Sequence, residues 1–551
     1  MLLRETGPGA GAGGEEEGLQ VEELAPPKAA GARGGGWGRR WLRVLLEDGP
    51  KDGDLNWAGQ AWQVVVAAAL TALVGGVLQL SKLADVDSAG RQFEQSSYAS
   101  KVSFLVPFAF SKALANFVVG FLADWPSLGR KKTEIIGWSV GLLVPVLLLS
   151  VPSRKEFWPM AVAANVFLGL QQGFCWSVLI IVFIDLFGPR HKGLASGANE
   201  TIGYTAVALF ALVYEVLERV SVRCAWREGP RSAACAASLA GCQGPDDWAQ
   251  ACTGECVCEG YYSRGSWIVG TMGIMCLCGL LGSILFLRET LDTVLRGKYI
   301  VEHSIVEMAV VEADEPDPAE DAALAPSSST VLLAPDAEDA KRTLLEGAAH
   351  WFGRTTWGNR STLLMCAAGF VANLTTGLAW GLILVWARDV LELDAAQRNT
   401  VTACYSFIKG LSQVGTGALS DRVGRRLPVA AGLVVTGAAL LVCGIGTAAV
   451  EAGGGGRHAI YVLLVLTGCV HGVGTGLMYP VLAAAVADHA PVEARAVCIG
   501  TFRFWRDLGY GAGALVAALA SVSGPNLAIS AIGVLCVLLG LLVFLRYKEA
   551  R

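Results

Sequence analysis

Two stretches of the sequence align with each other without a gap: FSKALANFVVGFLAD at residues 110–124 and FIKGLSQVGTGALSD at residues 407–421. The offset is 297 residues, and Phe, Lys, Leu, Gly, Leu and Asp fall in step. Apolar sequence alone would not keep a lysine, a glycine and an aspartate in register. A second correspondence pairs Gly169, Gly173, Asp185 and Pro189 with Gly472, Gly476, Asp488 and Pro491. The sequence therefore predicts an internal repeat of two halves.

The composition around the repeat is that of a membrane protein. The chain has 551 residues, of which 53% are hydrophobic and 17% charged, whereas soluble domains average about 25% charged residues. Apolar stretches of roughly 20 residues recur, and each is long enough to cross a bilayer as a helix. We expect an all-α fold with twelve transmembrane helices near 62–83, 101–123, 133–151, 158–187, 194–217, 266–287, 360–387, 399–420, 427–450, 458–487, 495–520 and 524–546.

The spans divide the chain into recognisable parts. Residues 1–60 are predicted to be a disordered tail, and the acidic, Pro-containing segment 288–358 a flexible linker. The linker separates a first six-helix half, 61–287, from a second, 359–547. The chain has no basic domain for nucleic acid, no phosphate-binding Gly-rich loop with Lys-Ser/Thr, and no metal-ligand constellation in its spans. We therefore expect no enzyme activity, no cofactor and no metal.

Short basic loops predict the orientation. Arg130-Lys131-Lys132, Arg190-His191-Lys192 and Arg422…Arg426 all fall on one side of the predicted spans. The positive-inside rule makes this side cytoplasmic, together with both termini and the linker. We expect the plasma membrane or another membrane of the secretory pathway.

The loop at 218–265 lies on the opposite side and is rich in cysteine. It contains Cys224, Cys235, Cys242, Cys252, Cys256 and Cys258. Six cysteines in one extracytoplasmic loop favour up to three disulfides, whose pairing stays open among fifteen arrangements. A zinc site is the alternative, because the last three cysteines are closely spaced.

The repeated stretches continue into two similar basic loops that resemble the signature loops of the major facilitator superfamily. The residues that carry the resemblance are Gly120, Asp124, Gly129 and Arg130 in the first copy, and Gly417, Asp421, Arg422, Gly424 and Arg425 in the second. The likeness covers roughly residues 60–547. It implies a fold of two pseudo-symmetric six-helix bundles, and it implies that the protein is a secondary transporter that works by alternating access. In the family the Asp packs against a helix N-terminus of the opposite half and the basic residues clamp it, which closes the cytoplasmic side. The alternative is that these basic loops only determine topology.

Ionisable residues inside the spans are the candidates for a substrate and ion site, because charge is costly in a bilayer. The candidates, with neighbouring polar residues, are Lys112, Asn116, Asn199, Glu200, Lys409, Gln413, His471, Arg503, Arg506 and Asp507. The family fold places the second helix against the eleventh and the fifth against the eighth. The resemblance therefore implies two contacts between halves, Lys112 with Asp507 and Lys409 with Glu200.

Three interpretations of these charges remain open: static salt bridges, a substrate and proton site, or side chains that reach water at helix ends. Four basic side chains outnumber two acidic ones, which favours an anionic substrate. Glu200 is the first candidate proton carrier and His471 the second. The expected partners are a small anionic substrate, protons and the lipid bilayer, and we expect a monomer. The alternatives are a nutrient sensor on a transporter fold, or a transporter of a neutral or cationic solute.

Overall fold

The computed structural model describes residues 57–123, 125, 127–187, 191–226, 256–291, 347, 349–454, 456–490 and 495–550. Its first half contains α2 (Trp57–Arg91), α3 (Tyr98–Lys101), α4 (Leu105–Leu122), α5 (Gly129–Gly141), α6 (Leu143–Leu148), a 3₁₀ turn (Lys155–Phe157), α7 (Trp158–Phe187), α8 (Lys192–Ser221), β1 (Arg223–Trp226), β2 (Cys256–Glu259) and α11 (Trp267–Leu285). Its second half contains a π turn (Arg354–Gly358), α14 (Arg360–Trp380), α15 (Leu382–Asp389), α16 (Ala395–Val423), α17 (Arg426–Ala452), α18 (Arg457–His489), α19 (Arg495–Ser523) and α20 (Pro525–Arg546). Each predicted span overlaps helical residues.

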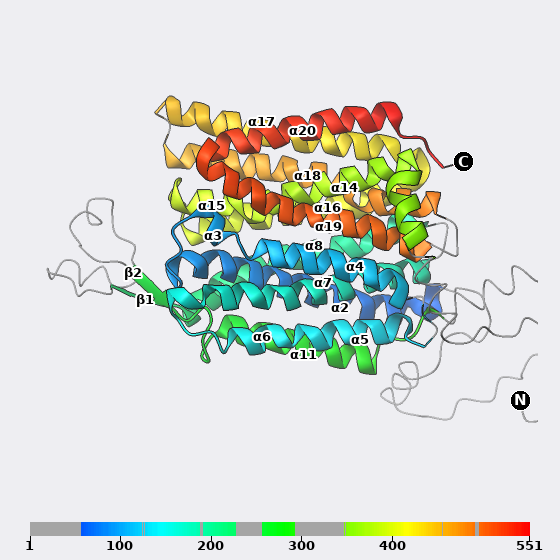
Figure 1. Ribbon diagram of the computed structural model, residues 1–551, viewed down its shortest axis with the longest axis horizontal. Helices are drawn as coiled ribbons and strands as arrows, with labels where there is room; N and C mark the ends of the chain where they lie inside the picture. The colour runs from blue at the N-terminus through cyan, green and yellow to red at the C-terminus, as the bar shows by residue number, and fades with distance from the viewer. Residues whose placement is uncertain are drawn as a thin grey trace, which may run out of the picture. The chain divides into compact units, whose positions relative to one another are not determined.

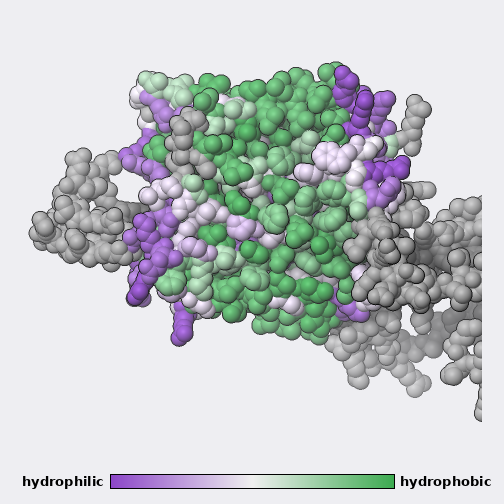
Figure 2. Space-filling view, viewed as in Figure 1, coloured by the Kyte–Doolittle hydropathy of each residue, from purple (hydrophilic) through white to green (hydrophobic). Residues whose placement is uncertain are grey.

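Within the described residues, nine helical segments are long and apolar enough to cross a membrane. The other three predicted spans are the broken pair α5–α6 and the two charged helices α16 and α19, so the count of twelve stays a prediction. Apolar side chains cover the middle of the face shown in Figure 2, and polar ones gather at its two ends. Large apolar side chains such as Ile274 and Leu545 are 66% and 73% exposed, as lipid-facing residues are.

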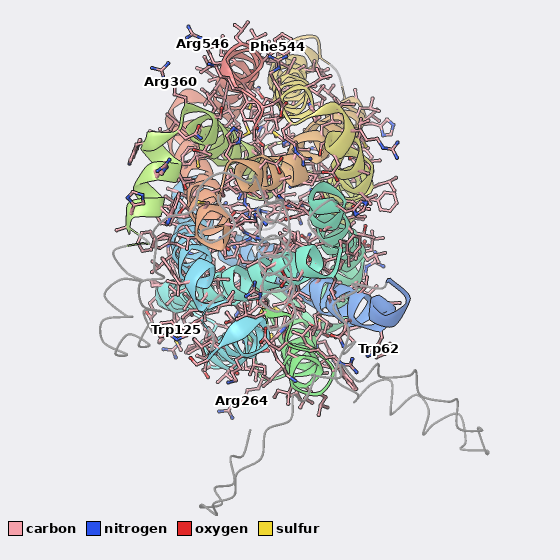
Figure 3. All side chains as sticks on the ribbon, turned by 90° about the vertical axis from the view of Figure 1, so that its right-hand side faces the viewer. Trp62, Trp125, Arg264, Arg360, Phe544 and Arg546 are labelled. Atoms are coloured by element: carbon pink, nitrogen blue, oxygen red, sulfur yellow. The ribbon has the colours of Figure 1, made fainter. Side chains whose placement is uncertain are left out.

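The helices pack in a repeated pattern. Within the first half, α4 packs on α7 and α2 on α8; within the second, α16 packs on α18 and α14 on α19. Two further contacts join the halves, α4 with α19 and α8 with α16, and Figure 1 shows these elements side by side. In the view along the bundle in Figure 3, Trp62 and Trp125 lie toward one side, and Arg360, Phe544 and Arg546 lie toward the other.

We call the two ends of the helical bundle the loop end and the motif end. The loop end carries β1 and β2, an antiparallel pair at the left of Figure 1. The motif end carries the turns before α5 and between α16 and α17, where the two signature sequences lie.

Glycine and glutamate shape both signature turns in the same way. Gly129 and Gly424 have φ of +65° and +88°, which an L side chain rarely adopts. Glu289, just after α11, accepts hydrogen bonds from the backbone N–H groups of residues 130 and 131 at 2.9 and 3.0 Å. Glu549, just after α20, does the same for residues 425 and 426 at 2.9 and 2.8 Å. Each carboxylate thus compensates the positive start of a helix.

Candidate functional site

A buried carboxylate, Asp507 on α19, gathers polar groups from both halves. It accepts hydrogen bonds of 2.5 Å from the side-chain amides of Asn116 and Asn373. The guanidinium of Arg506 donates to it through Nε at 2.7 Å and Nη2 at 3.0 Å. The ammonium of Lys112 lies 3.9 Å away. The contact between Lys112 and Asp507 that the sequence predicts is therefore present, and this carboxylate is well compensated.

Glu200, the predicted proton carrier on α8, has other neighbours. Its Oε1 accepts a hydrogen bond from Trp176 Nε1 at 3.1 Å and lies 4.0 Å from Arg506 Nη1. The predicted ion pair between Glu200 and Lys409 is not formed: the ion pairs described for the chain give Glu200 only Arg506. Its second oxygen, Oε2, is buried and has no hydrogen-bond partner within the described residues.

Aromatic rings take the place of the missing carboxylate around Lys409. The ammonium lies 3.8 Å from the ring centroid of Tyr204 and 3.8 Å from that of Tyr479. An aromatic face attracts a cation through its quadrupole, and more strongly where water is excluded. Sequence spacing does not reveal such a cage, because one tyrosine comes from α8 and the other from α18.

Several buried donors near this region lack partners. Lys409 Nζ, all three side-chain nitrogens of Arg503 and the amide nitrogen of Gln413 make no hydrogen bond within the part of the chain described. The three residues are 0%, 1% and 0% exposed. Buried polar groups are normally satisfied, and each unmade bond costs free energy. Two unpartnered acceptors, Glu200 Oε2 and Gln413 Oε1, accompany these donors, and neither bonds Lys409 or Arg503.

Asn199 and His471, also predicted for the site, lie against other groups. Asn199 Oδ1 accepts a hydrogen bond from Thr71 at 2.9 Å. The ring of His471 contacts Thr375 Oγ1 at 3.2 Å and lies 4.8 Å from the ring of Tyr405. His471 and Tyr405 line a small cavity of about 30 Å³ inside the second half. Their roles in binding stay predictions.

At the motif end, Asp421 joins α16 to the first turn of α8. Its two carboxylate oxygens accept hydrogen bonds from the backbone N–H groups of Gly193 and Leu194, each at 3.2 Å. Arg425 Nη1 holds the same carboxylate at 2.8 Å. A carboxylate at a helix N-terminus is stabilised by the helix dipole. These contacts are the arrangement that the family resemblance implies. The equivalent Asp124 lies outside the described residues.

Arg425 and Arg130 also bind acidic residues at the ends of α18 and α7. Arg425 Nε lies 2.8 Å from Asp488, and Arg130 Nε lies 3.1 Å from Asp185. Arg422, which the sequence predicts to take part in the gate, is exposed, so Arg425 provides the clamp. Neither aspartate was predicted to have a role, although the two occupy matching positions in the second repeat correspondence.

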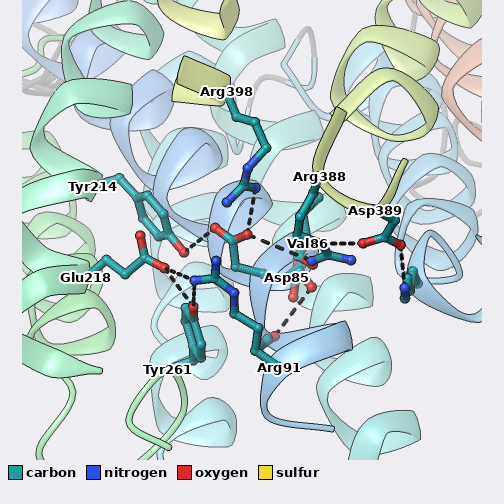
Figure 4. A network of polar contacts seen from close by, with 12 residues as sticks. Asp85, Val86, Arg91, Tyr214, Glu218, Tyr261, Arg388, Asp389 and Arg398 are labelled. Atoms are coloured by element: carbon teal, nitrogen blue, oxygen red, sulfur yellow. Dashed lines mark hydrogen bonds and ion pairs between the residues drawn. The ribbon is translucent and has the colours of Figure 1, made fainter. Parts of the chain in front are cut away.

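A second network, at the loop end, was not predicted. We call it the loop-end network; its charged residues are Asp87, Arg91, Lys101, Glu218, Arg388, Asp389 and Arg398. Figure 4 shows Arg398, Arg388 and Tyr214 converging on the end of α2. The network joins the halves at several points: Arg398 Nη1 lies 2.7 Å from Asp87, and Lys101 contacts Asp389. Arg388 Nη1 also donates to the carbonyl oxygen of Val86 at 2.7 Å. The sequence feature that could have revealed this network is the run of charged residues at 82–91. These residues belong to α2, which continues eight residues beyond the end predicted at 83.

One turn deeper on α2 lies a buried pair of charges that was also missed. Asn165 on α7 lies between them: it accepts from Lys82 Nζ at 3.3 Å and donates to Asp85 at 3.0 Å. The hydroxyl of Tyr262, just before α11, donates to Asp85 at 2.7 Å. This arrangement ties the loop end to the interior of the first half.

The cysteine-rich loop is only partly described. Cys224 and Cys258 face each other in the β1–β2 register, and Cys258 is buried. Cys235, Cys242 and Cys252 lie outside the described residues. Cys258 is disulfide-bonded. The other disulfides of the loop, their pairing and the zinc alternative stay predictions.

Comparison with known proteins gives a family match for the second half and a fold for the described chain. Residues 365–551 match the model of the Major Facilitator Superfamily. No curated protein sequence matches the chain significantly. The chain is similar in structure to the human organic anion transporter MFSD10 (TETRAN), with 16% identity, a TM-score of 0.55, and coverage of 88% of this chain and 99% of that one. It is also similar to the proton:xylose symporter XylE (14% identity, TM-score 0.56, coverage 90% and 98%) and the E. coli fucose:proton symporter FucP (14%, 0.53, 88% and 98%).

The described helices form two bundles joined through α4–α19 and α8–α16, and the family match lies in the second bundle. The second half of the chain thus matches the Major Facilitator Superfamily, and the described helices have the fold of transporters of that superfamily.

Proposed function

We propose that this protein transports a small anion by alternating access, with proton coupling through Glu200. The observation that carries the proposal is the pair of unpartnered buried cations, Lys409 and Arg503, described above. Of the four basic groups, Lys112 and Arg506 are already matched by Asp507.

A bound anion would supply the oxygen atoms that these two cations lack. In a low-dielectric interior the attraction between such charges is much stronger than in water. Two of the similar structures are proton symporters and one is an organic anion transporter, which is consistent with the proposal but does not identify the substrate.

The proposed proton step involves Glu200 and the cage around Lys409. With Oε2 unpartnered, Glu200 has room to take a proton without breaking its hydrogen bond from Trp176. An anion that draws Lys409 out of its tyrosine cage would change the charge facing this carboxyl, and so link its protonation to substrate binding.

We further propose that the motif end faces the cytoplasm and that the loop end faces an oxidising space, in the plasma membrane or another secretory-pathway membrane. Arg130, Lys131 and Lys132 at the start of α5, and Lys192 at the start of α8, place positive charge at the motif end. We expect a monomer with both termini cytoplasmic.

The first test is a thermal-shift screen of the purified protein with inorganic anions, organic acids, phosphorylated and neutral sugars, amino acids and organic cations. A ligand at 100 times its Kd adds about 2.7 kcal/mol of stability. We expect one anion class to stabilise the wild type and not Lys409→Ala. Lys155→Ala is the control, because it removes an exposed ammonium. Stabilisation only by neutral or cationic compounds would overturn the anion assignment.

Uptake of the anion so identified into proteoliposomes tests transport itself. We expect Lys409→Ala and Glu200→Gln each to reduce uptake to background while still inserting into the membrane. Near-normal uptake by both variants would reject the coupled site. Binding without any flux in the wild type would favour the sensor alternative.

A further inference from the structure

The loop-end network divides unequally between the two halves. Asp87 on α2 is held by Tyr214 of its own half, whose hydroxyl donates to Oδ2 at 3.1 Å. Its other oxygen, Oδ1, lies 2.7 Å from Arg398 Nη1 and 3.8 Å from Arg388 Nη1, and both arginines belong to the second half. Any opening of the loop end must separate this carboxylate from these guanidinium groups.

After such a separation the two sides are left in different states. Asp87 keeps the hydroxyl of Tyr214, and Arg388 keeps Asp389, whose Oδ1 lies 2.7 Å from Arg388 Nε. Arg398 would lose its ion pair, because within the described residues Asp87 is the acidic partner of its guanidinium group. Its side chain is only 3% exposed in the closed structure, and a guanidinium that loses its carboxylate before water or another anion reaches it is strongly unfavourable.

Parts of both guanidinium groups are unpartnered even in the closed state. Nε and Nη2 of Arg398 and Nη2 of Arg388 are buried and make no hydrogen bond within the described chain. Nε and Nη2 form the edge through which a guanidinium binds a carboxylate or other oxyanion with two parallel hydrogen bonds. The described network also holds four basic residues against three acidic ones.

We propose that Arg398 and Arg388 form a binding site for an oxyanion at the loop end, and that the anion replaces Asp87 as this end opens. The site would receive the substrate before it reaches Lys409 and Arg503, which lie elsewhere on α16 and on α19. The assignment of this oxyanion as the transported substrate rests on the proposed function. The replacement of Asp87 by an oxyanion at Arg398 rests only on the geometry of the loop end. The anion thereby offsets the cost of breaking the contact between the halves.

The test measures opening of the loop end directly, by the distance between two spin labels on the full-length protein in nanodiscs. The labels are attached through unnatural amino acids at Ser96 and Val390, so that native cysteines are untouched. Both positions are exposed, and they belong to different halves. The probes are sodium sulfate and sodium succinate, compared with sodium chloride at equal ionic strength.

We expect either probe to increase the long-distance population of the wild type relative to chloride. Asp87→Asn should raise this population without any probe and should respond to sulfate at about tenfold lower concentration, because the competing carboxylate is gone. Arg398→Gln should also open the loop end but lose the response. Arg154→Gln, which removes an ion pair that is exposed at both partners, should behave as the wild type.

Two results would overturn the proposal: an equal sulfate response in Arg398→Gln and the wild type, or no response in the wild type and Asp87→Asn. Thermal shifts with the same probes, measured on wild type and Lys409→Ala, separate the two ideas. Stabilisation that depends on Lys409 but occurs without loop-end opening rejects the loop-end site alone. Loop-end opening without stabilisation that depends on Lys409 rejects the central anion site alone.

Discussion

At the scale of single residues, the buried charges of this protein differ in how completely they are matched. Asp507 receives hydrogen bonds from three side chains, whereas Lys409 rests on two aromatic rings and Arg503 has no partner among the described residues. A carboxylate that accepts several hydrogen bonds is held in one position. The ammonium of Lys409 contacts aromatic faces and makes no hydrogen bond within the described residues, so its N–H groups can donate to a ligand, and the functional proposal rests on Lys409 for this reason.

Tyr262 is expected to stabilise the first half through its hydroxyl. Burial raises the pKa of the Tyr262 phenol well above its ordinary value, and the nearby Asp85 carboxylate adds to the shift. The hydroxyl therefore remains a neutral donor. Tyr262→Phe leaves an acceptor of Asp85 unsatisfied and should cost about 1–3 kcal/mol of stability, measured by thermal unfolding in detergent.

The same tyrosine predicts a pH dependence. A phenol whose pKa is higher in the folded than in the unfolded state contributes its full stability below the unfolded pKa of about 10 and loses it as the pH rises further. The difference between wild type and Tyr262→Phe should thus stay constant from pH 7 to 9. Tyr461→Phe, on a less buried ring, serves as the control. A difference that shrinks below pH 9 would contradict the buried hydrogen bond.

At the scale of elements, the sequence predicts the positions of helices better than their interruptions. The span expected at 133–151 is two helices, α5 and α6, because Pro145 has no N–H to donate to residue 141. The span expected at 360–387 is likewise α14 and α15, separated at Gly381. Hydrophobicity averaged over a window does not detect such local breaks.

The candidate site was predictable where the repeat or the family fold pairs helices, and not elsewhere. Lys112 with Asp507 follows from the pairing of α4 with α19. The cage of Lys409 depends on side-chain direction across three helices, and the loop-end network on residues far apart in sequence, such as Asp87 and Arg398. Neither the cage of Lys409 nor the loop-end network can be predicted from the sequence pattern of a single helix.

The glycine of the signature on α16 is expected to be needed for close packing against α8. A Cβ added at Gly417 would lie 2.2 Å from the carbonyl oxygen of Gly193, a backbone atom that has no room to move aside. Gly417→Val should prevent closure of the motif end, abolish uptake and cost about 1–3 kcal/mol of stability.

Gly415 offers a matched control on the same helix, because a Cβ there meets nothing within 4 Å. Gly415→Val should change stability by no more than about 0.5 kcal/mol and leave uptake intact. Equal effects of the two substitutions would show that helix propensity, and not the contact with α8, explains the loss.

At the scale of the whole molecule, both ends hold the halves together at once. Asp421 binds the start of α8 at the motif end, and Asp87 binds Arg398 at the loop end. In this structure polar contacts therefore close both ends of the interface between the halves. The proposed alternating access has the two ends open in turn, so weakening one end should favour the state that is open at that end.

The compartment of the loop end is tested by counting thiols. The chain has 15 cysteines, and the nine of the described residues that are free thiols all lie outside the 218–265 loop. If the six loop cysteines form three disulfides, alkylation of the denatured protein should label nine thiols before reduction and fifteen after it, as measured by mass spectrometry. Fifteen labelled thiols before reduction would contradict the disulfides and the oxidising compartment.

The charges of α16 and α19 also have a consequence for how the protein is made. Each basic or acidic residue at a helix centre opposes insertion by about 2.5–3.5 kcal/mol, and these two helices are absent from the nine segments apolar enough to cross alone. Their packing partners, α8 and α4, are synthesised earlier in the chain. We therefore expect α8 and α4 to assist the insertion of α16 and α19, and a second half expressed alone to insert these two helices poorly.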